Sequence, residues 1–160
     1  MVSSNFVLNR KELMQGLTKS SIRISRYFSE YPHEVWQAWT DPKLVKSWFG
    51  SDPNGTVLDA SLDVRLGGTF EVTFRNSDDT QFTCTGAYQE IEKYQRLVFT
   101  WTWKDRPEVR ELVTLVFQAE QNGTLMIFEH ANIDAGTTHG YEAGWKSTFD
   151  KLERTLKAGS

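Results

Sequence analysis

The sequence predicts an α+β fold in which a curved antiparallel sheet of six or seven strands wraps around one long C-terminal helix. Segments that alternate apolar and polar residues recur between Ile22 and His130, as is typical of strands with one buried face. Two short helical patterns follow the first of these segments. The last segment has apolar residues at helical spacing, and this face needs an apolar surface to cover it.

The first elements are a strand and two short helices. Ile22 to Phe28 alternates and predicts a strand. Pro32 and Pro42 each open a helix, because proline lacks the N–H that would stay unpaired in the first turn. Asp41 is expected to cap the second helix.

Period-two patterning returns after the helices and predicts six further strands, at about 57–64, 70–74, 82–88, 97–103, 113–117 and 126–130. Gly67-Gly68 is expected to permit a bend between strands. Lys104 to Glu108, which contains Pro107, is expected to form a loop, and Asn122-Gly123 a tight hairpin turn. Connections this short require antiparallel pairing.

The final helix is predicted by apolar residues spaced three and four apart, namely Tyr141, Trp145, Phe149, Leu152 and Leu156. Charged side chains occupy the opposite side. The apolar face is expected to lie against the concave side of the sheet, because no other large apolar surface remains.

A chain of 160 residues suggests one domain. We assign 21–158 to it and interpret 1–20 as an N-terminal arm, which is either a short helix at Lys11 to Leu17 or a frayed or partner-swapped segment. The net charge of −3 argues against nucleic acid as a partner. No apolar run is long enough to span a membrane, and no secretory signal is visible. Cys84 is the sole cysteine and is expected to be a buried thiol, which fits a cytoplasmic location.

Several local motifs occur in a fixed order. They are Val35-Trp36-Gln37-Ala38-Trp39-Thr40-Asp41-Pro42, Trp48-Phe49-Gly50, Asp63 to Phe70, Arg96 to Trp101, Thr124 to His130, and Gly144-Trp145. Together they resemble the START-like helix-grip superfamily and, within it, the family named for the activator of heat-shock protein 90 ATPase. The resemblance covers about Ser21 to Leu156. It implies the helix-grip fold, which hosts ligand carriers, polyketide cyclases, hydrolases and chaperone cofactors, and so it selects no single activity.

Ten side chains are expected to point between sheet and helix and to line a ligand-binding cavity: Trp39, Trp48, Phe70, Phe74, Phe82, Trp101, Phe128, His130, Trp145 and Phe149. Aromatic side chains suit a rigid-walled pocket, but they equally suit a filled core, and both interpretations stay open. His130 is either a hydrogen-bonded core residue or a polar anchor near the cavity rim. Arg65 either pairs with a nearby acid or binds a ligand carboxylate.

Catalytic machinery is not visible in the sequence. With one cysteine and three histidines, neither a metal site nor a cofactor is expected. No Gly-x-Ser-x-Gly elbow or Cys–His pair occurs. The sequence therefore favours binding of a small hydrophobic or amphipathic molecule.

Two alternatives remain. One is a cyclase or hydrolase in which His130 transfers protons. The other is a protein-interaction module, either a chaperone cofactor or a homodimer, that would use Trp36, Trp48 and Phe49 as a surface patch.

Overall fold

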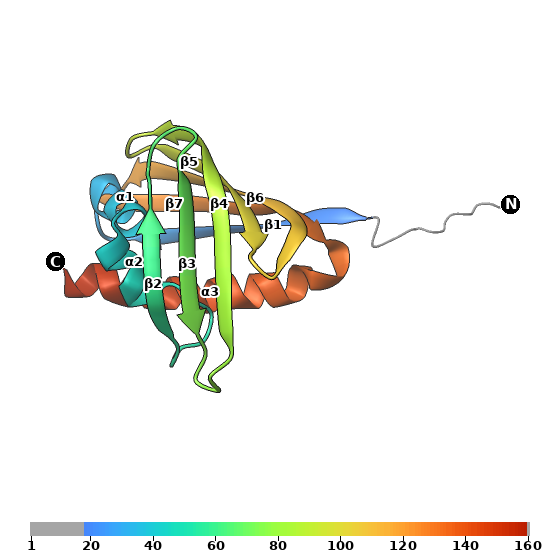
Figure 1. Cartoon of the computed structure of the whole chain (residues 1–160). Helices are drawn as coiled ribbons and strands as arrows, with labels where there is room; N and C mark the ends of the chain where they lie inside the picture. Colours follow the sequence, from blue (N-terminus) through green and yellow to red (C-terminus); the bar gives the residue numbers. More distant parts are fainter. Residues whose placement is uncertain (1–17, 160) are drawn as a thin grey trace, which may run out of the picture.

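The computed structural model describes residues 18–159 and confirms the predicted fold class. One sheet of seven strands has the order β1-β7-β6-β5-β4-β3-β2, and every neighbouring pair is antiparallel. The sheet is strongly curved, and the long helix α3 lies across its concave side (Figure 1). The helix considered at Lys11 to Leu17 lies outside the described residues.

The elements follow the predicted order. They are β1 (Lys19–Phe28), α1 (Pro32–Thr40), α2 (Pro42–Trp48), β2 (Thr56–Leu62), β3 (Thr69–Arg75), β4 (Gln81–Glu92), β5 (Arg96–Trp103), β6 (Arg106–Glu120), β7 (Gly123–Asp134), the short 3₁₀ helix η2 (Ala135–Thr137) and α3 (Thr138–Ala158).

The two short helices are fixed by local hydrogen bonds. The Asp41 carboxylate accepts the backbone N–H of Lys43 at 2.9 Å, which confirms the predicted cap of α2. The Trp48 indole then donates to the carbonyl of Ala38 at 3.0 Å. This buried bond joins α2 to α1 and so sets where the chain leaves α2.

The prediction of a loop from Lys104 to Glu108 is wrong. Trp103 pairs directly with Arg106, so only Lys104 and Asp105 turn the chain. Pro107 lies within β6, beside an irregularity in the β5–β6 register. Proline is tolerated at such a place because the hydrogen-bond ladder is already interrupted there.

The hairpin predicted at Asn122-Gly123 is displaced by one residue. The turn residues are Gln121 and Asn122, with φ of 49° and 63°, and Gly123 is the first residue of β7. A Cβ atom on Gly123 would collide with the carbonyl oxygen of Phe28. The glycine is therefore needed for close contact with β1 and not for the turn.

The bend expected at Gly67-Gly68 is confirmed. Gly67 has a φ of 80°, and a Cβ on Gly68 would collide with the carbonyl oxygen of Asp63. Arg65 pairs with both carboxylate oxygens of Asp63, at 2.9 and 3.0 Å, so it is an exposed ion pair with its neighbour.

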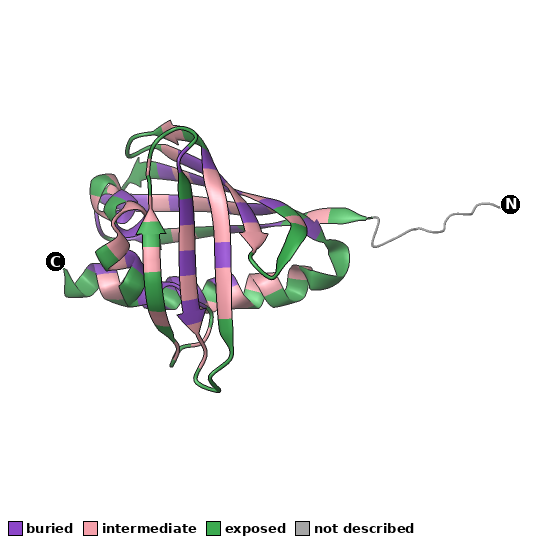
Figure 2. Cartoon of the chain, viewed as in Figure 1, coloured by how far each residue is buried: buried purple, intermediate pink, exposed green. Residues whose placement is uncertain are grey.

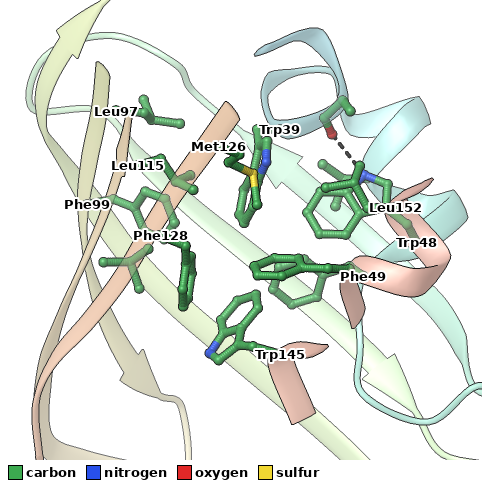
Figure 3. Packing of buried hydrophobic residues seen from close by; sticks show 14 of the residues in the cluster. Trp39, Trp48, Phe49, Leu97, Phe99, Leu115, Met126, Phe128, Trp145 and Leu152 are labelled. Atoms are coloured by element: carbon green, nitrogen blue, oxygen red, sulfur yellow. Dashed lines mark hydrogen bonds between the residues drawn. The ribbon is translucent and has the colours of Figure 1, made fainter. Parts of the chain in front are cut away.

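The core lies between the sheet and the C-terminal part of α3. Figure 2 shows burial alternating along the strands, as the period-two pattern requires. Figure 3 shows Trp39, Phe128 and Trp145 turned toward one another in this space. Phe128 and Phe149 are fully buried, with ring centroids 5.1 Å apart. The interior here is thus filled by side chains.

The surface patch proposed for protein interaction is not exposed. Trp36, Trp48 and Phe49 are all buried, and each packs against other aromatic rings. Cys84 is fully buried, as predicted, and burial raises the pKa of its thiol.

Candidate functional site

A cavity of about 420 Å³ lies beneath the first half of α3. Its walls come from η2 and α3, from the loop Phe49 to Ser51 after α2, and from β3, β5 and β6. Its exposed lining residues include Arg106, Gly136 and Gly140, so it opens to solvent beside η2 and the β5–β6 turn. We call it the α3 cavity.

Six aromatic side chains line the α3 cavity. They are Phe49, Phe74, Trp101, Trp103, Tyr141 and Trp145. Phe49 stacks on Trp101 with centroids 6.0 Å apart and an interplanar angle of 22°. Trp145 packs at a steeper angle against Trp101, at 5.4 Å. Rings held in this way form rigid apolar surfaces with few rotatable bonds.

Glycine keeps the helix side of the cavity open. Gly136, Gly140 and Gly144 recur every four residues and line the α3 cavity. A Cβ atom on Gly136 or Gly140 would meet no atom within 4 Å. Glycine in an α-helix is less stable than alanine by about 0.8–1 kcal/mol, so Gly140 keeps open space at the expense of helix stability. A Cβ on Gly144 would instead lie 3.3 Å from the Cβ of Ser51, so that glycine permits the close approach of the loop.

A chain of hydrogen bonds holds the polar edges of the cavity wall. The Trp145 indole donates to His130 Nδ1 at 3.0 Å, and His130 Nε2 lies 2.9 Å from Glu111 Oε1. The Tyr141 hydroxyl donates to the same carboxylate oxygen at 2.9 Å. Tyr141 in turn accepts the Trp103 indole N–H at 2.9 Å. Trp103, Tyr141 and Trp145 all line the cavity, so this network orients three of the side chains in its wall.

The partners of His130 define its tautomer. An indole N–H can only donate, so His130 Nδ1 accepts and carries no proton. Nε2 then carries the proton and donates to the Glu111 carboxylate. His130 is fully buried, and both of its ring nitrogens are engaged by protein groups.

Tyr141 is a partly buried member of the network. Burial is the main cause that raises the pKa of its phenol, and the nearby negative charge of Glu111 acts in the same direction. The phenol therefore stays protonated and keeps donating to Glu111.

The loop wall of the cavity is tied to α3. Ser147 donates to the carbonyl of Ser51 at 2.7 Å, and Lys151 Nζ donates to the carbonyl of Asp52 at 2.8 Å. Desolvation lowers the pKa of the Lys151 ammonium. The Asp52 carboxylate accepts the Ser77 backbone N–H and hydroxyl, both at 2.8 Å, and the backbone bond is the main cause that lowers the pKa of Asp52.

The structure places Phe74, Trp101 and Trp145 on the wall of the α3 cavity, out of the ten side chains that the sequence suggested. Phe82 packs behind this wall, against Phe74 and Trp103.

The remaining suggested residues lie deeper. Trp39, Trp48 and Phe70 surround a void of only about 20 Å³, and Phe128 and Phe149 are core residues. His130 is not at the rim, where it was expected, because β7 continues four residues further, to Asp134. It lies behind Trp145 and fixes the orientation of that ring.

Several wall residues were not among the sequence candidates. Tyr141 and Trp103 share helical or strand spacing with Trp145 and Trp101, so their positions were available from the periodicity. Glu111 falls on the inward-facing side of β6 with Val113, and a lone acid on an apolar face signals a buried partner. The four-residue spacing of the α3 glycines was a further signal.

Another hollow, of about 510 Å³, lies over strands β2 to β5. Half of its lining residues carry small hydroxyl side chains, including Ser61, Thr85 and Thr100, and Phe70 is its single aromatic lining residue among those described. Among residues 18–159, no three His, Cys, Asp or Glu side chains cluster in a way that could hold a metal ion. Within the same residues, no helix has the length and apolar character of a membrane span.

Comparison with known proteins identifies the family. Residues 31–157 match the family described as Activator of Hsp90 ATPase homolog 1-like protein. The chain belongs to this family. The match confirms the resemblance stated from the sequence motifs, and it covers α1 through α3 of the AHSA1-like chain. No curated protein matches the chain in sequence.

Solved structures agree with this AHSA1-like fold. Protein NE0264 from Nitrosomonas europaea is 24% identical over 87% of this chain and 95% of its own, with a TM-score of 0.76. The AHSA1-like protein from Aeromonas hydrophila is 23% identical over 88% and 94%, with a TM-score of 0.74. CalU16 from Micromonospora echinospora is 26% identical over 86% and 76%, with a TM-score of 0.66. These similarities support the fold and leave the ligand to be argued from the site.

Proposed function

We propose that this AHSA1-like protein binds a small hydrophobic or amphipathic molecule in the α3 cavity. The single observation that carries the proposal is a preformed space of about 420 Å³ with six aromatic side chains on its wall. Small-molecule sites typically have volumes of roughly 300–1,000 Å³ and are lined mainly by apolar and aromatic groups.

The glycines of α3 support the same conclusion. A well-packed interior leaves few voids, because lost contacts and lost burial destabilise the fold. Here a Cβ atom on Gly136 or Gly140 would meet no described atom within 4 Å. An open, rigid apolar wall beside them suits a ligand that supplies the missing contacts.

Binding is favoured over the cyclase or hydrolase alternative by the state of His130. A general base needs a free lone pair within reach of the substrate. The Nδ1 lone pair of His130 accepts the Trp145 N–H, and Nε2 faces Glu111. Neither nitrogen is free to take a proton from a molecule in the cavity.

A fluorescence titration with the neutral apolar probe phenylnaphthylamine tests the proposal. Gly140→Leu places a side chain in the cavity, and Ala143→Leu adds a leucine to an exposed site of the same helix. We expect Gly140→Leu to weaken probe binding about tenfold or more, and Ala143→Leu to leave it unchanged. Absence of probe binding to the wild type, or equal binding by the two variants with their folds intact, would reject the α3 cavity as the binding site.

A further inference from the structure

We infer that the molecule held in the α3 cavity is an aromatic carboxylate, with its ring between the aromatic walls and its carboxylate on Arg106 at the cavity mouth. This inference rests on the proposed function and specifies the chemical class of the ligand.

The α3 cavity carries positive charge at its wall. Of the described residues that line it, Arg106 is the only one with a charged side chain. The carboxylate of Glu111 does not line the cavity and lies behind Tyr141, whose hydroxyl donates to its Oε1. Arg106 is therefore the charged group that a ligand in the cavity meets directly.

Arg106 has no partner within residues 18–159, where it forms neither an ion pair nor a side-chain hydrogen bond. Three other arginines of the fold differ, whereas Arg23, Arg110 and Arg154 also have no ion pair among residues 18–159 but do not line the cavity. Arg26, Arg65 and Arg96 each have a carboxylate oxygen within 3.0 Å. A guanidinium offers a planar fork of N–H donors that matches a carboxylate, and at Arg106 this fork is free beside the opening.

The indole donors of the wall are not available to a ligand. Those of Trp103 and Trp145 are bonded to Tyr141 and His130, respectively. The indole nitrogen of Trp101 has no hydrogen-bond partner among the described residues, but it is buried and so does not face the open cavity. Arg106 is therefore the charged donor that a ligand in the cavity can reach.

The aromatic walls select the rest of the ligand. Phe49 and Trp101 stack nearly parallel, and Trp145 presents a tilted ring to them. Flat apolar rings pack well on such surfaces in offset or edge-to-face arrangements. A flat ring that bears one carboxylate meets both the apolar wall and the donor at the mouth.

Naphthoate and naphthamide are matched probes for this inference, because they share the ring system and differ in charge. We expect calorimetric titration of the full chain to give about three- to tenfold tighter binding of naphthoate, since Arg106 is exposed and its ion pair is partly screened. Added salt should weaken binding of naphthoate and leave naphthamide unaffected.

Arg106→Gln should abolish the preference for naphthoate, and Arg106→Lys should restore part of it. Arg110→Gln is the matched control, because Arg110 is an exposed arginine of the same strand outside the cavity wall. Equal binding of the two probes to the wild type, or a preference that survives Arg106→Gln, would overturn the inference.

The outcomes separate this inference from the proposed function. If both naphthyl probes bind equally and Gly140→Leu removes them, the cavity is the site and only the carboxylate assignment fails. If neither naphthyl probe binds although phenylnaphthylamine does, the carboxylate assignment also fails. If none of the three probes binds, the proposed function fails.

Discussion

Glu111 is the shared acceptor of the network behind the cavity wall, and its replacement tests whether that network holds the wall in place. Glu111→Leu removes the carboxylate and keeps an apolar side chain of similar reach. His130 Nε2–H and the Tyr141 hydroxyl then lose their acceptor. Glu111→Gln instead retains a carbonyl oxygen that can accept both bonds.

The expected loss of stability follows from the burial of the groups left behind. His130 has 0% exposure, so its N–H has no access to water, and an unpaired buried donor costs about 1–3 kcal/mol. Tyr141 is only partly buried, and its lost hydrogen bond to a charged group adds about 1 kcal/mol. We therefore expect Glu111→Leu to lower the free energy of unfolding by about 2–4 kcal/mol. Because leucine avoids the desolvation cost of burying a carboxylate, the loss in free energy of unfolding should lie toward the lower end of this range.

Glu111→Gln should lower the free energy of unfolding by about 1 kcal/mol or less, because it keeps both hydrogen bonds and loses only the extra strength that the negative charge gives them. Among residues 18–159, Glu111 Oε2 has no hydrogen-bond partner and is not one of the buried unpaired atoms, so an amide group there can be hydrated. Urea unfolding, followed by circular dichroism with an unchanged slope against denaturant, measures both variants. Equal stabilities of the two variants would show that the acceptor does not support the wall, and the network argument would be refuted.

Three further perturbations have defined outcomes. Gly140→Ala should raise the free energy of unfolding by up to about 1 kcal/mol and the melting temperature by about 2–4 °C, because alanine favours the helix and its Cβ would meet no described atom within 4 Å. A lower melting temperature would contradict the presence of open space beside Gly140. Asp52 has its pKa lowered by the Ser77 N–H, so it stabilises the fold above the carboxyl's usual value of 3.8 and this contribution disappears as the pH falls further. Asp52→Asn should therefore flatten the acid side of the stability profile from urea unfolding, and an unaltered profile would contradict this. The Cys84 thiol should react with a chromogenic disulfide reagent only when the chain unfolds, because burial raises its pKa; rapid reaction in the native state would disprove the assignment.

The fold was accessible from the sequence because each element follows from local rules. Proline and aspartate mark the helix starts, and period-two patterning marks the strands. The apolar face of α3 needs the sheet as its partner. The errors at Pro107 and Gly123 occurred where tertiary contacts set the turn. Gly123 is required by the approach of Phe28, a residue far away in the sequence.

The position of the cavity was less accessible. Inward-facing aromatic residues look alike in a sequence, whether they fill a core or line a space. Phe128 and Trp145 both point inward, yet only Trp145 reaches the α3 cavity. Phe128 lies on β7 and is buried against Trp145 and Phe149, whereas Trp145 lies in the first half of α3, where one side of its ring borders the open space. Residues that define the opening, such as Gly140 and Arg106, have no apolar signature at all.

The pairing of β1 with β7 has a consequence for folding during synthesis. Lys19 and Asp134 join these strands across 115 residues of chain. At about 5–20 residues per second, the ribosome needs roughly 6–23 s to produce that stretch. β1 must therefore wait for β7, because it has no other neighbour in the sheet among residues 18–159. Such distant pairing predicts slow folding, with an N-terminal segment that stays accessible to chaperones until β7 has been made.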